Sequence, residues 1–296
     1  GTTPVGIPVN PPTNTIYLSN HVSNTISVID GATNTVTNTI SVGANPHGVA
    51  INPTTNTIYA AIAGADSVAV IDGATNTVTT TIGTGGSIPY GITFNPITNM
   101  IYTANWNSGT VSVINGTTNT LKTTIPVGDN PFGIIVIPTT NTIYVTKSAI
   151  SNNNVGIIDG TTNAVTGNVY VGIAPFGIVY DSANDYLYVA NKNSNSVSVI
   201  DSATNTLVGS PISVGNSSAA IAYDSANGYL YLTNQIGDSV SVISTPAFFS
   251  VNVASPANTV ISDQSSCESS PISGVWSVDT CTISSLTINS GDSVTI

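Results

Sequence analysis

Short runs of alternating apolar and polar residues recur along most of the chain and are typical of β-strands. Between residues 46 and 83 four such runs follow one another: GVAIN (48–52), TIYAAI (57–62), SVAVID (67–72) and TVTTTI (77–82). They are rich in Val, Ile, Thr and Tyr, which favour strands, and no stretch has a convincing helical period. The intervening NPTTN and DGATN predict tight turns, because Pro, Gly and Asx residues favour them. The pattern therefore predicts four antiparallel strands joined by hairpins.

This four-strand unit recurs six times between residue 1 and about residue 250. The nine residues VIDGATNTV occur at 28–36 and again, unchanged, at 70–78, which is 42 positions later. Each copy also contains an aliphatic-Tyr pair, whose tyrosines are Tyr17, Tyr59, Tyr102, Tyr144, Tyr188 and Tyr231. A unit of ~40–45 residues with four strands is typical of a propeller blade, because stacked blades bury faces that one sheet leaves open. We predict an all-β, six-bladed β-propeller in which the tyrosines pack between blades; a straight solenoid, whose rungs are usually shorter, is the less favoured alternative.

The repeat resembles a known family. Segments such as TIYLSN (15–20), TIYVTK (142–147) and YLYVAN (186–191), each preceded by a Pro-x-Gly step and followed by a V-S-V-I-D-like run, resemble the YVTN-type β-propeller repeat of archaeal surface-layer proteins and related bacterial proteins. The resemblance covers residues 1 to about 245. It implies an extracellular scaffold or interaction module without a conserved catalytic set. Propellers of this family usually have seven blades, so a seven-bladed ring is the alternative to the six copies counted.

The C-terminal residues depart from the repeat. We assign residues 1–254 to the propeller, with FFSVNVA (248–254) as a candidate fourth strand of the sixth blade, and residues 255–296 to a small β module. Cys267 and Cys281 are the only cysteines and are expected to form a local disulfide, an unused reduced pair being the alternative. The final run DSVTI (292–296) predicts a strand that links subunits by adding to a neighbour's sheet edge. Packing of this module on its own propeller, or a degenerate seventh blade, remains equally open.

The composition excludes several classes of partner. Only 6% of residues are charged, Lys and Arg together number three, and the formal net charge is −11. Such a chain lacks the cations that bind nucleic acids or anionic membranes, and no apolar run reaches the ~18 residues of a membrane helix. The polar, uncharged surface favours an extracellular, cell-surface or secreted protein. Because the chain starts at Gly1, we expect a processed form or a fragment, and Asn115 and Asn216 begin glycosylation sequons.

Propeller topology predicts a candidate binding surface at one mouth of the central channel. The residue between Pro and Gly in each copy should rim that mouth, and the loops between second and third strands, which include Lys147 and Lys192, should emerge on the same face. The candidate residues at these positions are His21, His47, Tyr90, Trp106, Phe132 and Phe176. A largely aromatic rim with a few polar groups is suited to bind a ligand. The favoured alternative is that these aromatic residues plug the mouth of the channel as part of the core.

The sequence carries little catalytic chemistry. It has no Gly-rich phosphate loop, no G-x-S-x-G elbow and no H-E-x-x-H motif. His21 and His47, with Asp66, need further ligands before they would form a metal site, so we expect no cofactor. The repeated aspartates are interpreted as turn residues instead of calcium ligands, because Asn115 and Ser244 stand at equivalent places.

Three functions stay open from the sequence. The first is a non-enzymatic structural protein, a surface-layer or filament-type subunit that associates with itself or with other cell-surface proteins and glycans. The second is a carbohydrate- or protein-binding adhesin that uses the loop face. The third is an enzyme similar to propeller lactonases or lyases, which the mostly apolar channel mouth disfavours.

Overall fold

The computed structural model describes residues 1–149, 153–245, 252–254, 272–277, 280–286 and 293–295. The chain divides into two compact units: Gly1–Ser225 with Tyr229–Ile243, and Ala226–Gly228 with Ser244–Ile296. Apart from two 3-10 turns, η1 (Pro11–Thr13) and η2 (Ala63–Ala65), every regular element among the described residues is a strand. The predicted all-β class is therefore confirmed.

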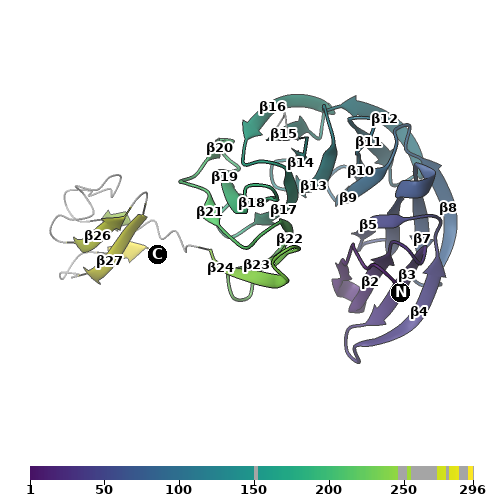
Figure 1. The fold of residues 1–296 in the computed structure, drawn as a ribbon, viewed down its shortest axis with the longest axis horizontal. Coiled ribbons are helices and arrows are strands. Elements are labelled where there is room, and N and C mark those ends of the chain that lie inside the picture. The colour runs from purple at the N-terminus through teal and green to yellow at the C-terminus, as the bar shows by residue number, and fades with distance from the viewer. Residues whose placement is uncertain (150–152, 246–251, 255–271, 278–279, 287–292, 296) are drawn as a thin grey trace. The chain divides into compact units, whose positions relative to one another are not determined.

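The first unit contains six antiparallel sheets that follow one another along the chain (Figure 1). The first sheet consists of β1 (Val9–Asn10), β2 (Thr15–Asn20), β3 (Thr25–Asp30) and β4 (Thr35–Ser41). The second consists of β5 (Pro46–Asn52), β6 (Thr57–Ile62), β7 (Ser67–Asp72) and β8 (Thr77–Gly83). The third consists of β9 (Pro89–Asn95), β10 (Met100–Asn105), β11 (Thr110–Asn115) and β12 (Thr120–Pro126). The fourth consists of β13 (Pro131–Ile137), β14 (Thr142–Lys147), β15 (Asn154–Asp159) and β16 (Ala164–Tyr170).

The fifth and sixth sheets vary this pattern. The fifth consists of β17 (Pro175–Asp181), β18 (Tyr186–Asn191) and β19 (Ser196–Asp201), with its outer position split between β20 (Thr206–Leu207) and β21 (Ile212–Ser213). The sixth contains three described strands, β22 (Ser218–Asp224), β23 (Tyr229–Asn234) and β24 (Ser239–Ser244). The innermost strands β5, β9, β13, β17 and β22 contact one another in succession. This is the predicted arrangement of six propeller blades.

The second unit corrects one expectation about blade closure. Its strands are β25 (Asn252–Ala254), β26 (Ile272–Ser277), β27 (Thr280–Leu286) and β28 (Ser293–Thr295). β25 pairs with β28, with Val253 opposite Val294, so residues 252–254 are not the fourth strand of the sixth blade. The same pairing gives the C-terminal strand a partner within its own unit. The other residues of FFSVNVA lie outside the described residues, as does Cys267, so the disulfide stays a prediction.

The repeated VIDGATNTV motif forms a self-capped hairpin. In the first copy Asp30 Oδ1 accepts hydrogen bonds from the backbone N–H groups of Ala32 and Thr33, both at 2.8 Å, and these bonds lower the pKa of Asp30. Asn34 follows in the left-handed region with φ 55°, which Asn tolerates well. Asn115 caps its own turn in the same way, accepting from the backbone N–H of Thr117 at 2.8 Å. These contacts support the interpretation of the aspartates as turn residues.

The repeated tyrosines connect successive sheets. Tyr17, Tyr59, Tyr102, Tyr144 and Tyr188 are at most 1% exposed. The Tyr102 hydroxyl donates to Asn163 Oδ1 at 3.0 Å, and Tyr144 donates to Asn205 at 2.7 Å. Each acceptor lies in the β-hairpin of the following sheet, at a left-handed position. The predicted packing of tyrosines between blades is thus confirmed for these copies, and three of them also make a hydrogen bond across the interface.

A buried asparagine ends the second strand of four sheets. Asn20, Asn105, Asn191 and Asn234 donate through Nδ2 to a serine of the third strand at 2.7–2.9 Å. The fourth sheet replaces this pair by Lys147 and Gly156. Lys147 is 5% exposed, its Nζ donates to Asn168 Oδ1 at 2.6 Å, and burial lowers its pKa. Lys147 was expected in a solvent-facing loop. It is instead the last residue of β14, and its amine reaches across β15 to Asn168 of β16.

Lys147 and Gly156 should be energetically coupled, because a Cβ on Gly156 would come within 2.9 Å of Lys147 Cε. We expect Gly156→Ser and Lys147→Asn each to destabilise the protein. The double variant recreates the Asn–Ser pair of four other sheets. Its loss of unfolding free energy should be smaller than the sum of the two single losses by about 1–3 kcal/mol. Urea unfolding of the four proteins measures this coupling. Strictly additive effects would contradict it.

Candidate functional site

The six residues selected from the sequence meet in one place. His21, His47, Tyr90, Trp106, Phe132 and Phe176 form a continuous network of ring contacts, here called the aromatic cluster. The ring centroids of His47 and Tyr90 are 4.5 Å apart, and those of Phe132 and Phe176 are 4.3 Å apart. Trp106 lies 5.6 Å from Tyr90 and 5.7 Å from Phe132. Six side chains from five successive sheets thus share one surface.

The innermost strands bring four of these rings together. His47, Tyr90, Phe132 and Phe176 are the second residues of β5, β9, β13 and β17, each followed by glycine. A Cβ on Gly48 would collide with the carbonyl oxygen of Tyr90, and one on Gly91 with the carbonyl oxygen of Phe132. Only glycine lets neighbouring backbones approach this closely. The Pro-x-Gly step therefore places the middle side chain of one blade against that of the next.

Loops between second and third strands supply the remaining groups. Trp106 and Lys192 each follow the last residue of a second strand, and their backbone N–H groups donate to Ile88 and Ala174, both at 2.9 Å. These bonds tie each loop to the connection from the preceding blade. Lys192 Nζ lies 4.6 Å from the centre of the Phe176 ring, a cation–π contact at one end of the cluster. Of the two lysines expected on this face, only Lys192 reaches the cluster.

The cluster is partly open to solvent and almost uncharged. All six rings are half-buried, so each keeps part of its surface accessible. Burial, helped by the nearby His21, lowers the pKa of His47 to about 4, and the imidazole is therefore neutral near pH 7. His21 Nδ1 is buried and has no hydrogen-bond partner among the described residues. The site thus offers aromatic faces and neutral polar edges, with one amine at its border.

Metal-binding geometry is not found in the part of the chain that the structure describes. No group of three or more His, Cys, Asp or Glu side chains there is placed to hold an ion. Asp66, considered as a third partner for the histidines, accepts a hydrogen bond from the backbone N–H of Ile88 at 2.8 Å. Its carboxylate therefore stabilises the connection between β8 of the second sheet and β9 of the third.

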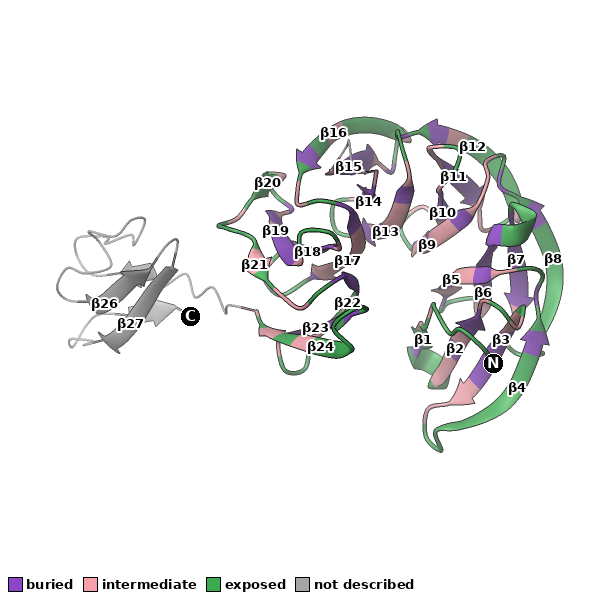
Figure 2. Ribbon diagram, in the orientation of Figure 1, coloured by how far each residue is buried: buried purple, intermediate pink, exposed green. Residues whose placement is uncertain are grey.

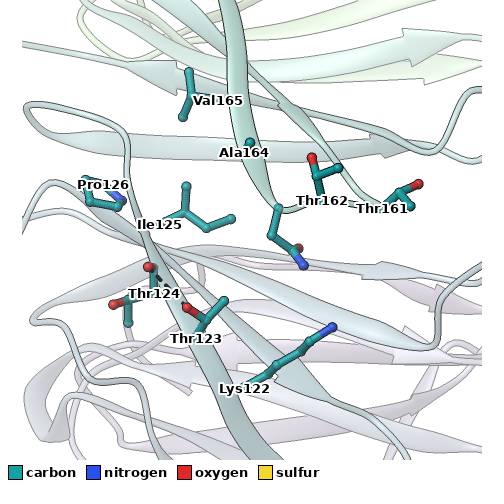
Figure 3. A pocket seen from close by; sticks show the side chains of 10 residues that line it. Lys122, Thr123, Thr124, Ile125, Pro126, Thr161, Thr162, Ala164 and Val165 are labelled. Carbon is teal, nitrogen blue, oxygen red and sulfur yellow. Dashed lines mark hydrogen bonds between the residues drawn. The ribbon is translucent and has the colours of Figure 1, made fainter.

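A groove that the sequence did not indicate lies between the outer parts of the third and fourth sheets (Figure 3). It is a shallow groove of about 580 Å³, lined by residues 122–126 of β12 and by residues 161–165 around the β15–β16 hairpin. Its polar groups are mainly threonine hydroxyls, and Lys122 is its one charged lining residue. The groove arises where neighbouring blades diverge, which no local motif reveals. It carries less chemistry than the aromatic cluster.

The two sequons lie in different loops. Asn115 ends β11 at a hairpin and is half-buried, whereas Asn216 is exposed just before β22. Glycosylation at either residue stays a prediction.

Comparison with known proteins identifies a family and two similar solved structures. A family model described as YNCE-like β-propeller matches residues 8–258. Among curated proteins no match is found. The solved structure of a functionally unknown protein from Desulfotomaculum acetoxidans DSM 771 is similar with a TM-score of 0.66 and 18% identity, covering 78% of each chain. Kuenenia stuttgartiensis hydrazine synthase is similar with a TM-score of 0.60 and 18% identity, covering 83% of this chain and 97% of that one.

At these identities both similarities establish the fold alone. Within the described residues no helix has the length and apolar character needed to cross a membrane.

The neutral state of His47 predicts a specific acid sensitivity. The folded pKa of about 4 lies below the ordinary value of 6.5, so the unfolded chain binds the proton first as the pH falls. The stability contributed by the neutral imidazole is complete above pH 6.5 and is lost as the pH falls from 6.5 toward 4. NMR titration of the imidazole should give the low pKa, and His47→Phe should remove this part of the acid destabilisation. A His47 pKa near 6.5 would contradict the burial argument.

Proposed function

Because the chain belongs to the YNCE-like β-propeller family, we propose that it is a non-enzymatic, extracellular interaction protein whose propeller is a scaffold and whose aromatic cluster is the binding surface. The observation that carries the proposal is the convergence of six partly exposed rings from five blades on one surface. The extracellular location and the scaffold role are supported by the uncharged composition and by the YVTN-type repeats.

The chemistry of the cluster favours a neutral ligand with both apolar faces and hydroxyl groups. Aromatic rings stack on the C–H faces of sugars, while the Tyr90 hydroxyl, the Trp106 indole and the neutral His47 ring offer polar edges. Lys192 is the one nearby cation, and it lies over Phe176. Recognition would thus depend on stacking and shape, since the site offers little charge for electrostatic steering. Cell-surface glycans, or glycosylated proteins, are the partners that this surface suits best.

An enzyme is the weaker alternative. Propeller lactonases and lyases need a metal or a nucleophile at the channel mouth, and the aromatic cluster supplies neither. Among the described residues, no further side chains are placed with the two histidines to hold a metal. These features support a binding role for the cluster.

A glycan array followed by titration calorimetry tests the proposal. We expect the wild-type protein to bind at least one neutral glycan class, and Trp106→Ala to weaken that binding at least about tenfold, or about 1.4 kcal/mol. Tyr170→Ala is the matched control, because Tyr170 is 72% exposed and makes none of the cluster's ring contacts. Tyr170→Ala should bind like the wild type.

If the aromatic cluster is instead a plug of core residues, a different result is expected. If no glycan or surface protein bound to the wild type while Trp106→Ala sharply lowered the melting temperature, the rings would be packing residues and the proposal would fail.

A further inference from the structure

The fourth sheet contains a lysine–asparagine pair that the first three sheets lack. Lys147 ends its second strand, at the position where four other sheets have asparagine. Gly156 takes the place of the serine on the third strand, and Asn168 of β16 lies directly opposite Gly156. The residues equivalent to Asn168 in the outer strands of the first three sheets are threonines: Thr39, Thr81 and Thr124. Three positions on three strands therefore differ together.

These three differences bring the Lys147 amine against the side-chain amide of Asn168. The amine passes over Gly156, where an added Cβ would lie 3.4 Å from Nζ, and Nζ ends 2.6 Å from Asn168 Oδ1. Among the described residues, this oxygen is the only hydrogen-bond acceptor that Nζ reaches. Because Oδ1 is bonded to Cγ, the amine is held beside the amide carbon as well. Well-oriented groups in contact within one molecule react with effective molarities of about 10⁵–10⁸ M.

The surroundings of the pair favour a reaction between the amine and the amide. Lys147 is 5% exposed, and burial lowers its pKa, although the negative charge of Asp129 acts in the opposite direction. A lower pKa increases the fraction of neutral amine, which is the nucleophilic form. Asn168 is exposed on the outer strand β16, most of whose length is exposed in Figure 2. A small molecule released from its amide therefore has a path to solvent.

We propose that Lys147 and Asn168 form an isopeptide bond within the chain. The lone pair of Nζ attacks Cγ of Asn168, a proton moves from Nζ to Nδ2, the Cγ–Nδ2 bond breaks, and ammonia leaves. The product is a secondary amide that joins Nζ to Cγ. The step exchanges one amide for another, so it needs no oxidant, reductant or cofactor. It also removes a basic amine, and with it one positive charge of the protein at neutral pH.

The bond ties the outermost strand of the fourth sheet to an interior strand. β16 pairs with β15 along one edge, and the new amide connects it across β15 to β14. No disulfide can serve this purpose in the first unit, because the two cysteines of the chain are Cys267 and Cys281. A covalent brace suits a scaffold protein, but its formation does not depend on the aromatic cluster or on its ligand.

Intact-mass spectrometry of the full-length protein tests the bond, because the loss of ammonia lowers the mass by about 17 Da. Storage at about pH 9, which increases the fraction of neutral amine, should bring the reaction to completion. We expect the wild type to show this deficit and both Asn168→Ala and Lys147→Arg to lack it. Asn168 is exposed and Arg keeps a donor at position 147, so both variants should fold, which circular dichroism would verify. Lys122→Met is the matched control, since Lys122 is an exposed lysine of β12, and it should keep the deficit.

Peptic digestion of the wild type should also release one branched peptide that contains both Lys147 and Asn168. This second readout is needed because a succinimide at Asn115, which precedes a glycine, loses ammonia as well. A deficit that persisted unchanged in Asn168→Ala would come from such a site and would overturn the proposal. A folded wild type that kept the full mass of its sequence after storage would overturn it too.

Discussion

The close approach of innermost strands is the constraint on which the rest of the structure depends. Neighbouring sheets can bury their apolar faces against each other only if β5, β9, β13 and β17 come within backbone contact. Glycines such as Gly48 and Gly91 permit this, because any side chain there would meet a carbonyl oxygen of the next blade. The same spacing aligns the tyrosines with asparagines of the following hairpin and sets the aromatic rings side by side. Architecture and candidate site are thus consequences of one contact repeated along the chain.

Paired residues at the interface between sheets differ from one sheet to another, and both members of a pair change together. Asn105 and Ser112 of the third sheet correspond to Ile62 and Ala69 of the second, which replace a hydrogen bond by apolar packing. In the fourth sheet the longer Lys147 occupies the space that Gly156 leaves. Its amine keeps an amide partner, which satisfies a buried donor in a protein that has few carboxylates. The repeat therefore conserves filled volume more strictly than residue type.

The sequence predicted most of the blades and all six members of the aromatic cluster, because both follow from local patterns. Alternation and Asx-Gly turns mark the strands, and the Pro-x-Gly step marks the position of each inner ring. The direction of Lys147 could not be predicted, since it depends on which face of β14 the last residue occupies. The β25–β28 pairing and the groove beside β12 depend on contacts between distant segments, which no single repeat encodes.

Fluorescence of Trp106 tests the central claim most directly. In a Trp276→Phe background Trp106 is the only indole in the chain, so its emission and its quenching by acrylamide report on the cluster. Gly91→Ala should force β9 and β13 apart and make Trp106 more accessible to the quencher. Gly83→Ala, where an added Cβ meets nothing within 4 Å, should leave the signal unchanged. Identical quenching of Trp106 in both variants would contradict the claim that the spacing of the inner strands builds the site.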